Sequence, residues 1–332
     1  MKKSQIKLIA IFILVLFAFT LAGCSQADKK QTPSPADTTA KQPLKRISII
    51  SGPSAGAWYL VAGGMAKVIN KYMPGYECTI EPGAGSENII RVANKEVVFG
   101  MVMSDCLFHA VNGTREFKEK YPQIQAMFGG HNNPMKLIAR VDSGIKTFAD
   151  LKGKKVALGF GGSSQALAAV AIMESLGMVA DKDYKAVWIT PAEITEALQD
   201  KTIDAGFNYT ADPTGVMVDL TTKVPIKFIP YDVDTVVQKH PYFYKTSIPK
   251  GIYKGVDAEY FAQGANVIMV THKDTDPELV YQITKVLMEH VDEVAEVHPA
   301  GKEWNLSNAT RGIISTYHPG AEKYLKEKGA LK

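Results

Sequence analysis

The 332-residue sequence predicts an α/β protein of two lobes, each a mostly parallel sheet flanked by helices, with hinge crossings between the lobes. Short apolar runs alternate with amphipathic helical patterns, which is typical of parallel strands joined by crossover helices. Two such series follow one another, and a late strand pattern at residues 266–271 is followed only by helical patterns. The late strand therefore predicts a chain that returns to the first lobe, and the length fits about two domains of ~150 residues each.

The first series occupies residues 47–112. Strands are expected at 47–50, 78–81 and 97–103, and helices at 59–69, from Ser86 onward and at 105–112. Each strand ends in small or polar residues, such as Gly52, Gly83 and Ser104, where the next helix begins. Ligands of open α/β sheets bind at that edge, and helix N-termini there offer free N–H groups to anions. The sequence therefore predicts a binding site at the carboxyl ends of these strands.

The second series occupies residues 156–229 and follows two strands expected at 124–128 and 135–141. Its strands are expected at 156–160, 187–189, 204–208 and 226–229, with helices at 166–176, at 191–199 and after Pro213. Residues 129–134, between the two earlier strands, are interpreted as a loop. His131 is the one histidine placed in a plausible cleft loop, and a surface loop histidine is its preferred interpretation.

The lobe boundaries follow from the late elements of the chain. Helical patterns at 277–289 and 319–328 come after the last strand. Crossings near 139–143 and 264–271 assign residues 44–141 and 265–332 to lobe 1 and residues 142–264 to lobe 2. A cleft is expected between the lobes.

The first 43 residues predict secretion and anchoring. Residues 1–23 combine a basic start with 15 apolar or small residues at 8–22, which fits a signal peptide better than a spanning helix. The motif Leu21-Ala22-Gly23-Cys24 resembles a bacterial lipobox, in which Cys24 is lipidated and becomes the mature N-terminus. Residues 24–43 are polar and predict a disordered tether. We therefore expect an extracytoplasmic, membrane-anchored lipoprotein. The alternative is a plain signal-anchor with a chance cysteine.

Composition and motifs exclude several classes of protein. The net charge is +4, and without the three lysines of the signal segment it is about +1, so no nucleic-acid partner is expected. No phosphate-binding Gly-x-x-x-x-Gly-Lys motif, nucleophile elbow or histidine pair at ligand spacing is present, so no cofactor, no metal and no enzyme activity are expected. Asp105 and Asp212 are interpreted as caps or ligand contacts rather than as an acid/base pair.

Two cysteines, Cys78 and Cys106, remain after Cys24. If the first strand lies between the second and the third, these cysteines belong to non-adjacent strands and cannot form a disulfide. Two free, buried thiols are therefore expected.

The order of motifs along the chain resembles one known family. The motifs are Ile-Ser-Gly-Pro-Ser-Ala-Gly-Ala-Trp-Tyr at 50–59, Glu-Pro-Gly-Ala-Gly-Ser-Glu-Asn at 81–88, Val-x-Ser-Asp at 102–105, Asp-Leu-Lys-Gly at 150–153, Gly-Gly-Ser-Ser at 161–164 and His-Pro-Gly-Ala at 318–321. Together with the lipobox, this order resembles the TAXI family of solute receptors that serve TRAP transporters. The resemblance covers residues 46–329.

The resemblance implies a periplasmic-binding-protein-like fold that closes on a small carboxylate or amino-acid-like solute, with glutamate or glutamine favoured, and presents it to TRAP membrane permease subunits. The ligand contacts that it implies are Gly56, Ala57, Trp58, Tyr59, Ser86, Asn88, Ser104 and Asp105 in lobe 1, and Ser163, Ser164, Gln165, Tyr209 and Asp212 in lobe 2. Ala57, Met103 and Gln165 depart from the family pattern and put glutamate itself in question. Arg91 and Lys136 are candidate counter-charges, with exposed surface as their default interpretation.

Two other functions remain open at this point. One is a substrate-binding protein of an ABC importer for thiamine precursors or sulfonates, which shares the two lobes and the Asp-Leu-Lys-Gly turn. The other is a surface lipoprotein that senses or adheres through its exposed face. A neighbouring permease gene without an ATPase would distinguish the TRAP receptor from the ABC protein, and an interlobe pocket lined by polar donors would argue against the adhesin.

Overall fold

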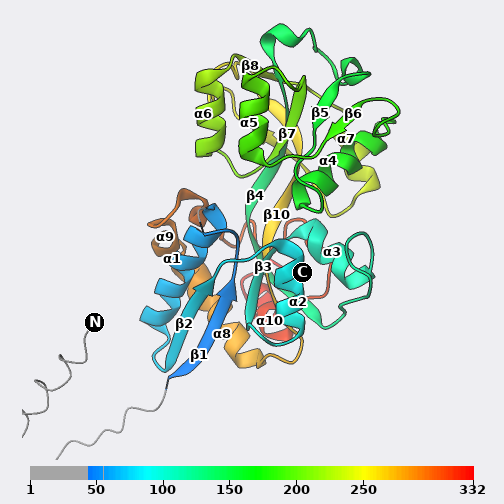
Figure 1. Ribbon diagram of the computed structural model, residues 1–332. Coiled ribbons are helices and arrows are strands. Elements are labelled where there is room, and N and C mark those ends of the chain that lie inside the picture. The colour runs from blue at the N-terminus through cyan, green and yellow to red at the C-terminus, as the bar shows by residue number, and fades with distance from the viewer. Residues whose placement is uncertain (1–43, 55) are drawn as a thin grey trace, which may run out of the picture. The chain divides into compact units, whose positions relative to one another are not determined.

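The computed structural model describes residues 44–54 and 56–332 (Figure 1). The expected signal peptide, the lipidated Cys24 and the tether fall on residues 1–43 and lie outside the described residues. Within the described ranges, no helix has both the length and the apolar character that a membrane span requires.

Lobe 1 contains three parallel strands in the order β2-β1-β3, followed by the antiparallel strand β10. These strands are β1 (Lys45–Ile50), β2 (Tyr76–Glu81), β3 (Phe99–Met103) and β10 (Tyr260–His272). Because β1 pairs in parallel with both β2 and β3, the carboxyl ends of all three strands meet at one edge, as the sequence predicts.

Lobe 2 repeats this arrangement, with parallel strands in the order β6-β5-β7 followed by the antiparallel strand β4. The strands are β4 (Ile124–Arg140), β5 (Lys155–Ala157), β6 (Lys185–Val187), β7 (Ala205–Tyr209), β8 (Ile226–Phe228) and β9 (Tyr244–Ile248). The strand β8 pairs antiparallel with β4, so the sheet is less uniformly parallel than the alternation of elements predicts. No sequence pattern predicted β9.

The strand β4 passes through both lobes, which corrects the prediction of two strands around a loop. It pairs with β10 from residue 124 to residue 134 and with β7 from residue 135 to residue 139. Gly130 makes this path possible, because a Cβ atom there would lie 2.0 Å from the ring of Trp304. The strand β4 changes partner from β10 to β7 at residues 134–135, and β10 changes partner from β4 to β9 at Gly264.

Ten α-helices cover the sheet in the described part of the chain (Figure 1). They are α1 (Ala57–Tyr72), α2 (Gly85–Ala93), α3 (Ser104–Asn112), α4 (Ser164–Ser175), α5 (Pro191–Gln199), α6 (Gly215–Lys223), α7 (Val233–Lys239), α8 (Pro277–Glu289), α9 (Val291–Ala295) and α10 (Pro319–Glu327). The late helices α8 and α9 pack against α1, and α10 packs against α8 and β4. Their packing places the C-terminal helices against elements of lobe 1.

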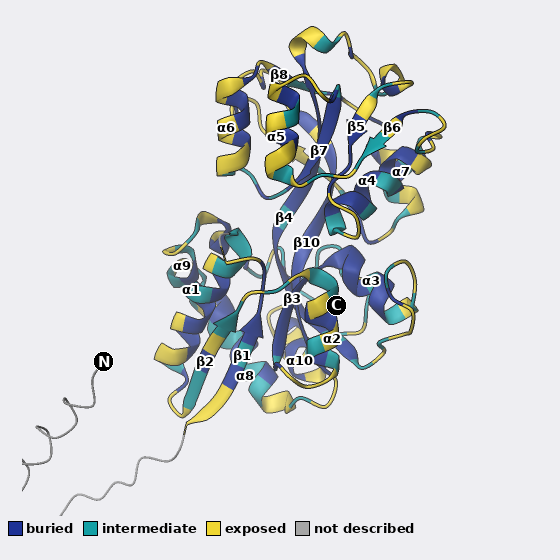
Figure 2. Cartoon of the chain, viewed as in Figure 1, coloured by how far each residue is buried: buried dark blue, intermediate teal, exposed yellow. Residues whose placement is uncertain are grey.

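The buried residues form the interior of both lobes and most of the crossing strands β4 and β10 (Figure 2). Ile49, Ile50, Phe99 and Val270 are fully buried, as expected for strands covered on both faces. Cys78 and Cys106 are buried and free, which confirms the prediction of two unpaired thiols.

Candidate functional site

A cavity of about 750 Å³ lies between elements of the two lobes. Residues at the N-termini of five helices line it: α1 and α2 from lobe 1 and α4, α5 and α6 from lobe 2. Gly85, the first residue of α2, lies close to α4, since a Cβ atom added to it would be 3.5 Å from Ser164 Oγ. The beginnings of these helices therefore converge on one cavity, which is the geometry that binds anions at α/β strand ends.

The two lobes differ in how their helices are capped. The three lobe 2 helices at the cavity carry hydroxyl caps: the side chains of Ser163, Thr190 and Thr214 accept hydrogen bonds from the N–H groups of Ala166, Glu193 and Met217. The caps of α1 and α2 are Gly56 and Ala84, which have no side-chain acceptor. The first N–H groups of α1 and α2 therefore lack the partner that a capping side chain supplies, and a ligand oxygen can take that place.

Eight of the predicted contact residues line the cavity: Gly56, Ala57, Trp58, Ser86, Ser163, Ser164, Gln165 and Tyr209. These side chains differ in whether hydrogen bonds within the protein already occupy their donors and acceptors. The Ser86 and Ser164 hydroxyls make no hydrogen bond within the described part of the chain, whereas the Ser163 hydroxyl caps α4 and donates to the Phe160 carbonyl. Gln165 donates to the Leu158 and Phe207 carbonyls and accepts from the Tyr209 N–H. Gln165 therefore shapes the wall of the cavity, and the serines at 86 and 164 keep free donors.

The other five predicted contacts, Tyr59, Asn88, Ser104, Asp105 and Asp212, do not line the cavity. Asn88 is fully buried and donates to the carbonyls of Ser51 and Met101, and Ser104 donates to the Tyr242 carbonyl. Asp105 is 2% exposed, and burial raises the pKa of its carboxyl to about 7. Asn88 and Ser104 are committed to backbone carbonyls, whereas Asp105 Oδ1 is buried without a hydrogen-bond partner among the described residues. None of these groups lines the cavity, so ligand contact by them finds no support in this geometry.

Asp212 forms a buried ion pair with Lys136, which corrects the default interpretation of Lys136 as an exposed residue. Lys136 Nζ lies 2.9 Å from Asp212 Oδ1 and 2.8 Å from the Thr210 carbonyl oxygen. Arg91, the other candidate counter-charge, pairs with Glu81 and Glu96 instead. Neither cation lines the cavity.

Sequence reasoning missed several residues of the cavity wall. Glu116, His131, Asn133, Asn208 and His298 line it. His131 is 0% exposed within β4, so its interpretation as a surface histidine is wrong. The alternation of His131, Asn133 and Met135 has the period of a strand, but Gly129, Gly130 and Pro134 had favoured a loop.

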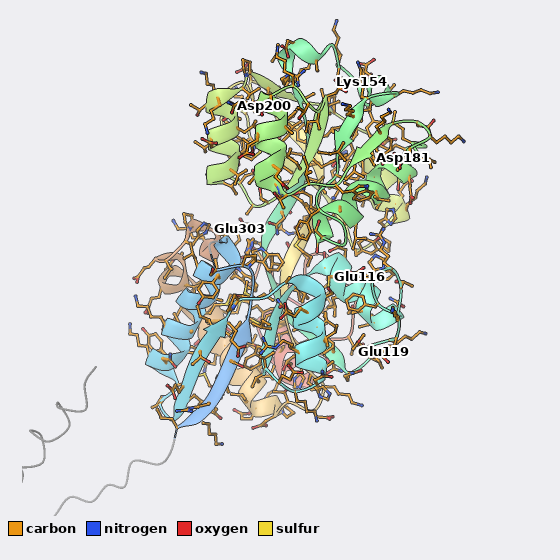
Figure 3. The ribbon with its side chains drawn as sticks, in the orientation of Figure 1. Glu116, Glu119, Lys154, Asp181, Asp200 and Glu303 are labelled. Carbon is orange, nitrogen blue, oxygen red and sulfur yellow. The ribbon has the colours of Figure 1, made fainter. Side chains whose placement is uncertain are left out.

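The wall carries few charged groups. Among the described residues that line it, Glu116 is the one carboxylate, His131 and His298 are the two imidazoles, and no lysine or arginine is present. Burial raises the pKa of Glu116 and lowers the pKa of both histidines, that of His131 to about 3. Figure 3 labels Glu116 on the segment after α3, where lobe 1 approaches α4. An anion in this cavity would be held by N–H and O–H groups rather than by a cationic side chain.

The described residues contain no group of three or more His, Cys, Asp or Glu side chains that could hold a metal ion. The cavity lining consists of hydrogen-bonding groups and apolar side chains. Exposed apolar side chains on the lining include Leu60 from lobe 1 and Phe160 and Val216 from lobe 2.

Comparisons with known proteins agree with this architecture. The model of the NMT1-like family matches residues 49–329. A TctC solute-binding protein from Polaromonas is similar with a TM-score of 0.55 at 15% identity, over 86% of this chain and 98% of that chain. The periplasmic aliphatic sulphonate-binding protein SsuA from Escherichia coli is similar with a TM-score of 0.50 at 16% identity, over 86% of this chain and 83% of that chain.

These likenesses concern the fold, because the identities are low. The family match spans most of the chain and includes every element that lines the cavity. The chain has the two-lobed fold of periplasmic solute-binding proteins and belongs to the NMT1-like family.

Proposed function

We propose that this protein is an extracytoplasmic receptor of the TAXI type, which binds a small carboxylate or amino-acid-like solute between its lobes and delivers it to TRAP membrane permease subunits. In this proposal the chain is anchored to the membrane through a lipidated Cys24. It binds and releases its solute without chemical change.

The observation that carries the proposal is the convergence of five helix N-termini on one cavity, two of them without a capping side chain. Each helix N-terminus favours a nearby negative charge by about 0.3–1 kcal/mol, and by up to ~2 kcal/mol when it is partly buried. Hydrogen bonds to a charged group add about 1.5–3 kcal/mol each. Micromolar affinity needs only about 8 kcal/mol, so these groups suffice for a carboxylate without an arginine.

Glu116 supports an amino-acid-like solute. Its Oε2 atom is buried and has no hydrogen-bond partner in the described structure. An α-ammonium group near Glu116 would supply that partner, and a carboxylate would lie at the uncapped helices α1 and α2. A sulfonate would suit the same helix N-termini, so the ABC-importer function is the competing proposal.

Ligand binding is tested by isothermal titration calorimetry of the full chain with L-glutamate, L-glutamine, 2-oxoglutarate and ethanesulfonate. We expect micromolar binding of at least one carboxylate. Ser164→Ala should weaken it about 3- to 10-fold through loss of one hydrogen bond. Lys154→Ala is the matched control, because Lys154 lies in lobe 2 away from the cavity lining (Figure 3). Binding of ethanesulfonate alone would favour the competing function, and binding of none of the four would contradict the proposal.

Delivery is tested in vesicles that contain the cognate permease. An imposed ion gradient should drive uptake of the bound solute without ATP. Uptake that requires ATP would mean that the partner is an ABC importer and not a TRAP permease. Metabolic labelling with a radioactive fatty acid should mark the wild-type chain and not the Cys24→Ser chain. Equal labelling of the two chains would contradict the proposed anchor at Cys24.

A further inference from the structure

Besides Glu116, two side chains in the cavity wall have hydrogen-bonding atoms that nothing in the described structure satisfies. They are His131 Nε2 and the Tyr209 hydroxyl. His131 is 0% exposed and Tyr209 is 8% exposed, and both residues line the cavity. They come from the paired strands β4 and β7. In this pairing Tyr209 lies opposite Met135, which follows His131 by four residues in β4. An unsatisfied polar atom at such depth is rare in a folded protein and calls for a partner.

Trp304 determines which of the two imidazole nitrogens of His131 carries the proton. The indole Nε1–H donates to His131 Nδ1 over 3.0 Å. An indole N–H can only donate, so Nδ1 must be the unprotonated nitrogen of a neutral ring. Burial lowers the pKa of His131 to about 3, so the ring is neutral at physiological pH. Its proton therefore resides on Nε2, the atom without a partner.

The surroundings hold the ring in this orientation. Trp304 is 1% exposed and packs against Gly130, and its ring meets that of His131 at 5.7 Å and 62°. The Trp58 ring approaches from α1 at 6.3 Å and 69°. His131 therefore offers a fixed donor, with no freedom to become an acceptor.

Tyr209 supplies a second group at the same wall. Among the described residues its hydroxyl has no hydrogen-bond partner of normal geometry, although the equally unsatisfied Gln263 amide lies nearby. Burial raises the pKa of Tyr209 well above its ordinary value, so the hydroxyl keeps its proton and can donate.

We propose that His131 Nε2–H and the Tyr209 hydroxyl form the recognition point for oxygen acceptors of the solute, such as the oxygens of a carboxylate, carbonyl or sulfonate group. This inference rests on the proposed function and deepens it, because it states which chemical group the wall at β4 and β7 selects. An ammonium group is rejected there, since the donor on Nε2 has no lone pair to offer it. The ammonium of a zwitterionic solute must lie elsewhere in the cavity.

The test combines calorimetry and NMR on the full chain, with L-glutamate and ethanesulfonate as probes. His131→Phe removes the donor and should weaken binding of the bound probe about 10- to 100-fold. His131→Gln restores an N–H donor at a similar reach and should stay within about threefold of wild type. Tyr209→Phe deletes only one oxygen atom, keeps the packing and should weaken binding about 5- to 10-fold.

The NMR experiment reads the tautomer directly in ¹⁵N-histidine-labelled protein without ligand. The spectrum should show His131 protonated at Nε2 and not at Nδ1. In Trp304→Phe the preference for the proton on Nε2 should weaken. On addition of the bound probe the Nε2–H signal should shift.

Three outcomes distinguish the proposed function from the recognition point at His131 and Tyr209. If wild type binds neither probe, the proposed function fails for these solutes, and the inference that depends on it falls as well. If wild type binds a probe while His131→Phe and Tyr209→Phe bind it equally well, the function stands and the recognition point is overturned. Protonation at Nδ1 in the ligand-free spectrum also overturns it, whatever the affinities.

Discussion

Lys136 Nζ lies 2.9 Å from Asp212 Oδ1, and the two side chains are 0% and 8% exposed. This ion pair ties β4 to the segment after β7. The Tyr253 hydroxyl also donates to Asp212 Oδ1, and Lys136 donates to the Thr210 carbonyl. Thr210, Ala211 and Pro213 line the cavity, so the ion pair fixes one wall of the site without contact to its interior.

Breaking this ion pair on one side should destabilise the protein strongly. Lys136→Met leaves the Asp212 carboxylate buried without its cation and should lower the free energy of unfolding by about 3–5 kcal/mol. The double variant Lys136→Met, Asp212→Asn removes both charges and should recover much of that loss. Urea denaturation followed by circular dichroism measures both values. Equal losses in the single and double variants would show that charge pairing is not the cause.

Asn88 and Ser86 should separate stability from binding. Asn88→Ala removes two buried hydrogen bonds, to the carbonyls of Ser51 and Met101, and should lower the free energy of unfolding by about 2–4 kcal/mol. Ser86→Ala removes a hydroxyl with free capacity at the start of α2 and should change stability by less than about 0.5 kcal/mol. It should weaken solute binding about 3- to 10-fold. Calorimetry and urea denaturation of both variants check this division of roles, and the reverse pattern would contradict it.

Asp105 and His131 should impose opposite pH dependences on stability. The pKa of Asp105 is raised by burial from 3.8 to about 7, so the folded state holds more protons between these values, and this contribution to stability falls as pH rises. The pKa of His131 is lowered by burial from 6.5 to about 3, so its contribution rises with pH over that range. The two slopes oppose one another between about pH 4 and pH 6.5.

Asp105→Asn should reveal the first of these slopes. Its free energy of unfolding, relative to wild type, should increase as pH rises from 4 to 7, by on the order of 1.4 kcal/mol per pH unit. Urea denaturation at several pH values measures this difference. His131→Gln serves as the comparison, because it should lose the opposite slope. A difference between Asp105→Asn and wild type that does not vary with pH would mean that Asp105 is ionised in the folded protein.

The two body cysteines should be inert. Burial raises the pKa of Cys78 to about 12 and that of Cys106 well above its ordinary value, so little thiolate is present in the folded state. In the Cys24→Ser chain, a maleimide should label neither thiol within minutes, but should label both at once in guanidinium chloride. Mass spectrometry of the labelled protein gives the number of labelled thiols. Rapid labelling of the folded chain would contradict the buried positions.

Local sequence patterns determined the repeated strand, turn and helix units and the cavity edge that they form. Small residues at Gly56, Ser86 and Ser164 mark where helices begin, and turn chemistry and periodicity act over a few neighbouring residues. A single sequence therefore suffices to predict that these positions gather at the carboxyl ends of the strands.

The tertiary structure alone decided which side chains face the cavity and which brace its walls. Asn88 and Asp212 follow the same local patterns as Ser86 and Tyr209, yet they are committed to buried partners. His131 lies in a strand because β10 pairs with β4 and because Trp304, distant in sequence, packs on Gly130. Contacts between residues far apart in the chain carry the energy that overrides local propensity, so only the folded chain shows where each polar group finds its partner.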